Sequence, residues 1–141
     1  MSRVPPFHLA VPVHDLAAAR RFYGELLECP LGRSAERWID FNFFGHQLSI
    51  HLVEGQDECI ARNEVDGEQV PARHFGVVLS VQRWLGLRER LKAQEQDFLI
   101  EPQCRFQGLP GEQYTMFLLD PSGNALEFKA FADPAQLFAA E

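Results

Sequence analysis

The chain has 141 residues, a net charge of −7 and 46% hydrophobic residues, among them 12 Phe. This length and apolar content fit one domain with one core. The negative charge and the lack of a Lys/Arg cluster argue against nucleic acid and anionic membranes as partners, because both are themselves negatively charged. The sequence shows no signal peptide and no apolar run near the ~20 residues that span a bilayer. We therefore expect a soluble, cytoplasmic protein.

A weak internal repeat organises the sequence. Residues 8–16 and 74–81 each begin with a histidine on a short apolar strand, and each leads into an amphipathic helix. The spacing of apolar residues predicts the first helix over about 15–28, with Asp15 as its N-cap, and the second over about 82–94. The two halves of the chain are therefore expected to share one local architecture.

Each half then ends in a predicted hairpin with a glycine at its turn. The strands of these hairpins are expected at residues 38–44 and 47–53 in the first half, and at residues 114–119 and 125–131 in the second. The second turn is Asp-Pro-Ser-Gly at 120–123, in which proline presets φ and glycine tolerates a positive φ.

Two segments lie outside the repeat. Residues 54–72 are polar, carry several acidic side chains and lack periodicity, so they are expected to form a connector or a mobile loop. Asp133 followed by Pro134 predicts a short C-terminal helix over about 133–140, with Asp as the cap and Pro at the first position. The three cysteines lie far apart and are expected to be reduced thiols.

Three polar side chains on predicted strands are candidate metal ligands. His8 and His74 occupy matching places in the two halves, and pairing of the halves would bring their strands together. Glu127 lies among apolar residues, where a carboxylate is costly to bury unless it meets a cation or several donors. Two imidazoles and one carboxylate form a facial set that leaves positions open for substrate, water or dioxygen. The alternatives are structural histidines and a Glu127 paired with Arg105 or backbone donors.

The first half offers a further candidate. Aligning the two turn glycines sets Ser49 at the place of Glu127, and His51 shares its face because side chains alternate with a period of two. His51 is either a residue of the site or a structural hydrogen bonder. His46 and His14 are poor candidates, because the first lies at the turn with the opposite parity and the second just precedes a helix cap.

These segments resemble the vicinal oxygen chelate superfamily, which includes glyoxalase I, extradiol dioxygenases, and fosfomycin and bleomycin resistance proteins. The resemblance spans about residues 6–131. Its motifs are HLAV at 8–11, DL at 15–16, RFY at 21–23, RHFGV at 73–77 and, most specific, DPSGNALEF at 120–128. It implies an α+β fold of two βαβββ modules, at about 6–55 and 73–131 of a single domain 1–141, forming a curled mixed sheet around a central cleft.

The resemblance also implies the ligand set. The family takes its ligands from the first strand of each module and the last strand of the second, which are His8, His74 and Glu127 here. Fe²⁺, Mn²⁺, Ni²⁺ or Zn²⁺ would suit them. Glyoxalase I usually has a fourth ligand, typically Glu, where this chain offers His51 with Ser49 beside it. This departure weakens the glyoxalase I interpretation, whereas extradiol dioxygenases need only the set that the chain keeps.

We therefore expect a metal-dependent dioxygenase, lyase or isomerase, in which the metal binds two adjacent substrate oxygens as a Lewis acid. His51 and Tyr114 are the candidate catalytic residues, with His51 also a candidate fourth ligand. The candidate cleft residues are Phe43, Ser49, Arg105 and Phe117. The alternative is a metal-free small-molecule binding protein of the bleomycin-resistance type. The expected partners are a small-molecule substrate and a second copy in a homodimer, with the cleft built within one chain or between two.

Overall fold

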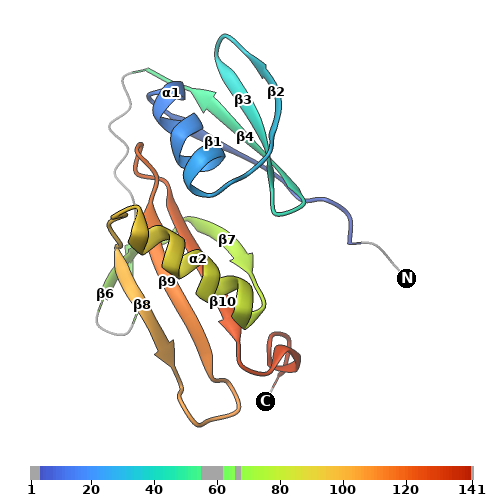
Figure 1. Cartoon of the computed structure of the whole chain (residues 1–141), viewed down its shortest axis with the longest axis vertical. Coiled ribbons are helices and arrows are strands. Elements are labelled where there is room, and N and C mark those ends of the chain that lie inside the picture. The colour runs from blue at the N-terminus through green and yellow to red at the C-terminus, as the bar shows by residue number, and fades with distance from the viewer. Residues whose placement is uncertain (1–3, 55–61, 66–67, 141) are drawn as a thin grey trace. The chain divides into compact units, whose positions relative to one another are not determined.

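The computed structural model describes residues 4–54, 62–65 and 68–140. The chain forms two compact units, of which the first contains residues 1–58 and 120–124 and the second residues 59–119 and 125–141. Each unit carries a four-stranded mixed sheet, and both are drawn in Figure 1. The α+β class with two βαβββ modules, predicted from the sequence, is confirmed.

The first unit has the order strand, helix, strand, strand, strand. Its elements are β1 (His8–Val13), α1 (Leu16–Ala19), η1 (Arg20–Leu26), β2 (Leu31–Ala35), β3 (Trp38–Phe43) and β4 (His46–Leu52). The strands lie in the order β1-β4-β3-β2. The first strand pairs with β4 in parallel, whereas the other pairs are antiparallel. The first and last strands of the module therefore lie side by side.

The helix of the first unit begins as predicted and ends slightly earlier. The side chain of Asp15 accepts a hydrogen bond from the backbone N–H of Ala18 at 3.1 Å, as an N-cap does. After one turn the helix widens into the π-helix η1, in which the N–H of Leu27 bonds to the carbonyl of Phe22 at 3.0 Å. Glu28 then takes a φ of 56°, which ends the helix before Pro30.

The Asp-Pro-Ser-Gly turn belongs to the first unit and is held there by Asp120. This carboxylate is 4% exposed and accepts hydrogen bonds from the backbone N–H groups of Ser122 and Asn124 at 2.9 and 2.8 Å. It also accepts the hydroxyl of Tyr23 at 2.7 Å. Burial raises the pKa of Tyr23 well above its usual value, and the Asp120 carboxylate raises it further, so the phenol remains a donor. Gly123 has a φ of 89°, which confirms the predicted turn.

The second unit contains the same order of elements as the first, preceded by a pair of strands and followed by a short 3₁₀ helix. Its elements are β5 (Arg62–Val65), β6 (Glu68–Pro71), β7 (His74–Val78), α2 (Val81–Ala93), β8 (Ile100–Arg105), β9 (Gln113–Leu119), β10 (Ala125–Phe131) and η2 (Pro134–Gln136). The four-stranded sheet has the order β7-β10-β9-β8, with β7 parallel to β10. This topology matches that of the first unit and confirms the internal repeat.

Two predictions for the segments outside the repeat need correction. The connector contains an antiparallel pair, β5 and β6. The sequence did not predict these strands, because polar strands of a two-stranded sheet show no apolar periodicity. The rest of that prediction, at 55–61 and 66–67, lies outside the described residues. The C-terminal helix is a single 3₁₀ turn, although Asp133 caps it as expected by accepting the N–H of Ala135 at 3.1 Å.

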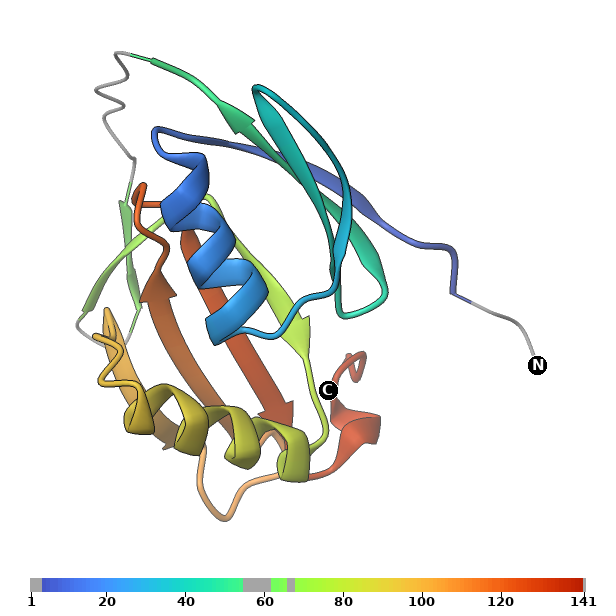
Figure 2. The same ribbon diagram turned by 45° about the horizontal axis from the view of Figure 1, so that its top comes forward.

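Helix α2 covers one face of the second sheet, as Figure 2 shows. Ser80 caps it by accepting the N–H of Arg83 at 3.2 Å, and Trp84, Leu87 and Leu91 form its buried stripe. The indole Nε1–H of Trp84 donates to the carbonyl of Phe128 on β10 at 2.9 Å. Helix and sheet are therefore joined by a polar contact inside an apolar layer.

The register of the parallel pairs is the same in both units. On β1 and β4, Ala10 is opposite Ser49, two residues beyond His8. On β7 and β10, Gly76 is opposite Glu127, two residues beyond His74. Ser49 and Glu127 therefore hold equivalent places, as the alignment of the turn glycines predicted.

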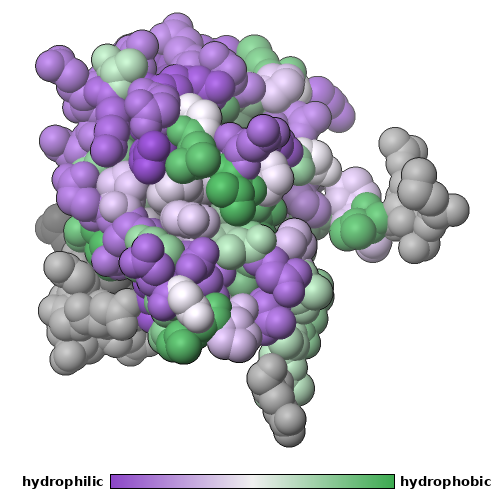
Figure 3. All heavy atoms as spheres, turned by 60° about the horizontal axis from the view of Figure 1, so that its bottom comes forward, coloured by the Kyte–Doolittle hydropathy of each residue, from purple (hydrophilic) through white to green (hydrophobic). Residues whose placement is uncertain are grey.

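Of the helices in the described part of the chain, none is long and apolar enough to cross a membrane. Figure 3 shows a face on which hydrophilic residues surround smaller hydrophobic patches. Among the residues whose burial the structure describes, the exposed large hydrophobic side chains are Val4, Phe7, Leu31, Val78, Phe106, Leu109, Leu137 and Phe138.

Two described cysteines, Cys29 and Cys104, are free thiols. Burial raises the pKa of Cys29 to about 12, so its thiol stays protonated at neutral pH. Cys59 lies outside the described residues.

Gly76 makes the close approach of β7 to β10 testable. A Cβ at this position would overlap the backbone oxygen of Glu127 and lie 2.6 Å from its carbonyl carbon. Gly76→Ala should therefore lower the free energy of unfolding by about 1–3 kcal/mol or more in urea denaturation. The matched control is Gly86→Ala in the interior of α2, where a Cβ meets nothing within 4 Å. That variant should gain about 0.5–1 kcal/mol; equal effects of the two substitutions would contradict the prediction.

Candidate metal centre

His74 and Glu127 lie together on the face of the second sheet that α2 does not cover. His74 is the first residue of β7 and Glu127 the third of β10, which runs parallel beside it. The distance from His74 Nε2 to Glu127 Oε1 is 3.5 Å. The carboxylate belongs to a buried residue, 8% exposed, whereas the imidazole is 31% exposed. The structure thus brings two of the three predicted ligands together.

The hydrogen bond of the other ring nitrogen of His74 determines whether Nε2 faces Glu127 as a donor or as an acceptor in the neutral ring. His74 Nδ1 lies 2.9 Å from the carbonyl oxygen of Pro71, the last residue of β6. Because a carbonyl only accepts, Nδ1 must carry the proton, and in the neutral ring Nε2 presents its lone pair toward Glu127. Two acceptors at this distance need a proton or a metal cation between them. Metal-binding histidines usually donate their second N–H to a carbonyl in this manner.

The two oxygens of Glu127 have different partners. The hydroxyl of Thr115, which is 1% exposed, donates to Oε2 at 2.6 Å. Lys129 Nζ lies 3.8 Å from Oε1, the oxygen that faces His74. The buried carboxylate is therefore satisfied on one side by a neutral donor and faces cationic or ionisable groups on the other. Arg105 was the alternative partner expected from the sequence, but the partners found are Thr115, His74 and Lys129.

A hollow of about 260 Å³ opens beside this pair, lined by residues 74–78 of β7 together with Glu127 and Lys129. The ring of Phe117, 3% exposed, meets the imidazole of His74 edge to face with 5.1 Å between ring centroids. Phe117, predicted to line the cleft, thus contacts the imidazole but does not line this hollow, and its role in the site stays a prediction. An apolar ring beside a carboxylate strengthens its attraction for cations by excluding water.

The remaining predicted ligand lies in the first unit. His8 is exposed at the start of β1, opposite Gln47. In the described part of the chain, no three His, Cys, Asp or Glu side chains form a group that could hold a metal ion. The role of His8 therefore stays a prediction from the sequence.

Ser49 and His51 lie on β4 with different environments. Ser49 is buried and its hydroxyl donates to Asp40 Oδ1 at 2.6 Å, whereas His51 is exposed opposite Trp38. Asp40 also accepts Gln47 Nε2 at 3.2 Å. Sequence reasoning missed Asp40, although its register opposite Ser49 follows from the same hairpin alternation.

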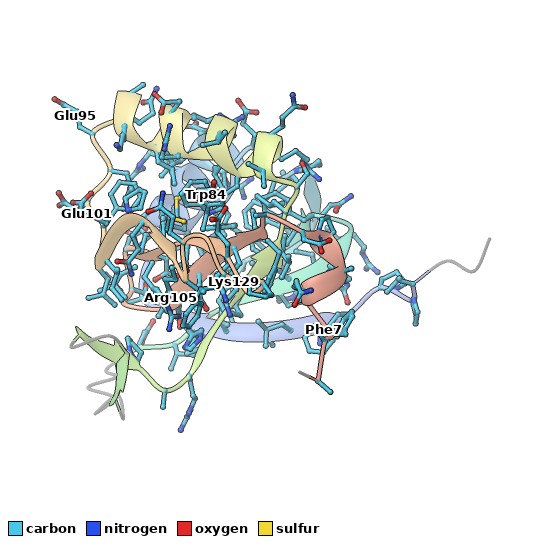
Figure 4. The ribbon with its side chains drawn as sticks, turned by 90° about the horizontal axis from the view of Figure 1, so that it is seen from below. Phe7, Trp84, Glu95, Glu101, Arg105 and Lys129 are labelled. Atoms are coloured by element: carbon cyan, nitrogen blue, oxygen red, sulfur yellow. The ribbon has the colours of Figure 1, made fainter. Side chains whose placement is uncertain are left out.

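Two predicted site residues point to the helix-covered side of their sheets. The ring of Tyr114 packs against Trp84 of α2, with 5.4 Å between centroids, on the face opposite Glu127. Phe43 is 5% exposed and shares one face of β3 with the buried Ile39 and Phe41, and Phe41 contacts Tyr23 of η1. The roles of Tyr114 and Phe43 in the site stay predictions. Arg105, by contrast, lies on the side of the sheet away from Trp84, as Figure 4 shows.

The chain is similar to known proteins over most of its length. The sequence model described as the Glyoxalase/Bleomycin resistance protein/Dioxygenase superfamily matches residues 6–128. A glyoxalase/bleomycin resistance protein/dioxygenase from Alicyclobacillus acidocaldarius is 36% identical, with a TM-score of 0.79 over 94% of this chain and 96% of that one. No curated protein matches the sequence.

Two more distant solved structures share the fold. A lactoylglutathione lyase from Agrobacterium tumefaciens is 19% identical, with a TM-score of 0.63 over 90% of this chain and 96% of that one. The fosfomycin resistance protein FosX from Listeria monocytogenes is 18% identical, with a TM-score of 0.66 over 97% of this chain and 99% of that one.

The hydrogen bond from Thr115 to Glu127 gives a test of how the carboxylate is held. Thr115→Val keeps the shape but removes the donor, which leaves a buried carboxylate oxygen unsatisfied. We expect the free energy of unfolding to fall by about 1–3 kcal/mol in chemical denaturation. Thr115→Ser retains the hydroxyl and should lose less; a Ser variant as unstable as the Val variant would show that packing, and not the hydrogen bond, is responsible.

Proposed function

Because the chain belongs to the glyoxalase/bleomycin resistance protein/dioxygenase superfamily, we propose that it is an enzyme that uses a divalent metal bound by His74 and Glu127. The observation that carries the proposal is the orientation of His74, whose Nδ1–H is held by the Pro71 carbonyl while Nε2 faces a carboxylate oxygen at 3.5 Å. His8 is the third ligand that the sequence predicts. A neutral imidazole and a carboxylate suit Fe²⁺, Mn²⁺, Ni²⁺ or Zn²⁺.

The residues around the pair have separate tasks in this proposal. Pro71 fixes the ring and its tautomer, and Thr115 holds Oε2 so that Oε1 is directed at the metal position. The buried ring of Phe117 keeps water from one side of the pair. A divalent ion at this place supplies a Lewis acid that stabilises negative charge on a bound substrate oxygen.

The substrate we propose is a small molecule that chelates the metal through two adjacent oxygens, and the reaction is of the extradiol dioxygenase or glyoxalase type. Ser49 occupies the place equivalent to Glu127, so β4 offers no carboxylate there. This favours chemistry that needs only two histidines and one carboxylate. His51, exposed on the same strand, is proposed as an acid or base or as a fourth ligand. A homodimer in the cytoplasm completes the proposal.

A metal-free binding protein is the second candidate, and one contact favours it. Lys129 Nζ, 3.8 Å from Glu127 Oε1, places a positive charge near the carboxylate without any metal. In this alternative the face would bind a small molecule without transforming it. The charge of Glu127 would be compensated by Lys129, which lies on the same strand.

Metal uptake decides between the two. Protein freed of metal with a chelator should take up one ion per chain from Fe²⁺, Mn²⁺, Ni²⁺ or Zn²⁺, measured by elemental analysis. At an ion concentration 100-fold above the dissociation constant, binding adds about 2.7 kcal/mol of stability, so Tm should rise on the order of 10 °C. His74→Ala and Glu127→Gln should abolish both uptake and the Tm rise.

Two further variants complete that experiment. His14→Ala, at an exposed histidine outside the proposed set, is the matched control and should behave as the wild type. His8→Ala tests the third ligand, because full uptake in this variant would remove His8 from the set. A wild type that gains neither metal nor thermal stability would leave the metal-free binding protein as the function.

The two reaction types differ in what they consume. Metal-loaded protein of the dioxygenase type should take up oxygen with catechols, whereas a glyoxalase-type enzyme should isomerise the hemithioacetal of glutathione without oxygen uptake. In either case Glu127→Gln should lower kcat/KM by at least about 100-fold, because loss of transition-state charge stabilisation has costs of this size. Activity that survives in Glu127→Gln would contradict the proposed site.

A further inference from the structure

We propose that Lys129 is an internal counterion of Glu127, which a divalent metal must displace, and that this competition sets the metal affinity of the site. The inference rests on the proposed function and deepens it by naming a residue that regulates metal loading. In the metal-free protein the ammonium compensates the carboxylate, and metal binding exchanges one cation for another. Loading and release of the ion are thereby made reversible.

Strand β10 places the ammonium beside the carboxylate. Residues two apart on a strand point to the same side of the sheet, so Lys129 shares the face of Glu127. Figure 4 shows Lys129 on the side of the sheet away from Trp84. Lys129 Nζ lies 3.8 Å from Glu127 Oε1, the oxygen that faces His74 Nε2 at 3.5 Å. The lysine and the imidazole thus converge on one carboxylate oxygen.

Glu127 needs a positive charge when no metal is bound. Its side chain is 10% exposed, and a buried carboxylate is costly unless it is paired. The hydroxyl of Thr115 satisfies Oε2 but carries no charge. The neutral ring of His74 presents a lone pair to Oε1, because its proton is held on Nδ1 by the Pro71 carbonyl. With the ring neutral, the ammonium of Lys129 supplies the compensating charge.

The first unit offers an internal comparison. By strand register, Ser49 holds the place of Glu127. His51, two residues after Ser49, holds the place of Lys129. The carboxylate of that unit, Asp40, instead accepts the neutral hydroxyl of Ser49 at 2.6 Å. The lysine is therefore found in the module whose carboxylate stands beside a histidine, and not at the equivalent place of the other module.

The ion pair is weak enough for a metal to displace it. At 3.8 Å, Nζ and Oε1 are too far apart for a hydrogen bond, so the attraction between them is that of charge alone. A divalent ion on Oε1 repels the ammonium, because like charges a few ångströms apart repel each other. The Lys129 side chain is 35% exposed and has a flexible four-carbon stem, which lets Nζ move away.

The displaced ammonium has a place to go. Lys129 is the cross-strand neighbour of Val78 on β7, and both line the hollow of about 260 Å³ beside the pair. Val78 is itself 43% exposed, so this end of the hollow is open to water. An ammonium that turns into the hollow is hydrated there and stays close enough to return when the metal leaves.

The test is a calorimetric titration of metal-free protein with Zn²⁺, a probe without redox chemistry. Lys129→Gln should bind Zn²⁺ about 10-fold more tightly than the wild type, because the competing charge is gone. Lys129→Arg keeps the charge and should bind Zn²⁺ no more tightly than the wild type. The matched control is Lys92→Gln, exposed on α2, which makes the same change in net charge and should leave the affinity unchanged.

A second readout needs no metal. In the metal-free protein, Lys129→Gln should lower Tm by about 1–4 °C, because a partly exposed ion pair is lost. The same substitution in a Glu127→Gln background should leave Tm unchanged, since the partner charge is absent. A merely structural role of the lysine stem would lower Tm in both backgrounds and would not raise the affinity for Zn²⁺.

The outcomes separate this inference from the proposed function. A wild type that takes up Zn²⁺ while Lys129→Gln binds it no more tightly overturns the inference alone. An equal gain in affinity in Lys92→Gln does so as well, because the effect would then come from net charge. An equal loss of Tm in both backgrounds also excludes the counterion role. A wild type that takes up no metal overturns the proposed function and this inference with it.

Discussion

The close approach of β7 to β10 at Gly76 is the constraint on which the second unit and its site depend. A parallel pair brings the first and last strands of the module together, and at Gly76 the backbone of Glu127 occupies the space where a side chain would begin. This approach sets His74 and Glu127 on neighbouring strands with 3.5 Å between their polar atoms. A bulkier residue would move the strand that carries the carboxylate, and with it the oxygen that faces the imidazole.

Two groups that are not themselves proposed ligands orient His74 and Glu127. The Pro71 carbonyl accepts the Nδ1–H of His74, and the Thr115 hydroxyl donates to Glu127 Oε2. These contacts use Nδ1 of His74 and Oε2 of Glu127. The remaining atoms, His74 Nε2 and Glu127 Oε1, are directed toward each other. Such contacts orient ligands before a metal arrives, which lowers the cost of ordering them when it binds. The ammonium of Lys129 provides the charge that would otherwise be missing near a buried carboxylate.

The two modules share a topology but differ in their chemistry. Equivalent registers carry Glu127 in one and Ser49 in the other, and the residue opposite is Phe117 in the first case and Asp40 in the second. In the first unit the carboxylate, Asp40, belongs to β3 and accepts a hydrogen bond from Ser49. In the second unit the carboxylate, Glu127, belongs to β10 and lies beside His74. A duplicated fold keeps its strand pairing through backbone hydrogen bonds, so the side chains of its two modules can differ while the topology stays the same.

Much of this protein was determined by local sequence. Caps at Asp15 and Ser80, turns at Gly45 and Gly123, and alternation along the hairpins predicted the repeat and the equivalence of Ser49 with Glu127, because these depend on near neighbours in the chain. The tertiary structure decided the rest. Tyr114 packs against Trp84 on the face that α2 covers. Strand alternation predicts which residues share a face, but it does not predict which of the two faces the helix covers. Pro71, Thr115 and Lys129 became partners of the site through β6, β9 and β10, since contacts between strands depend on a register that no single segment encodes.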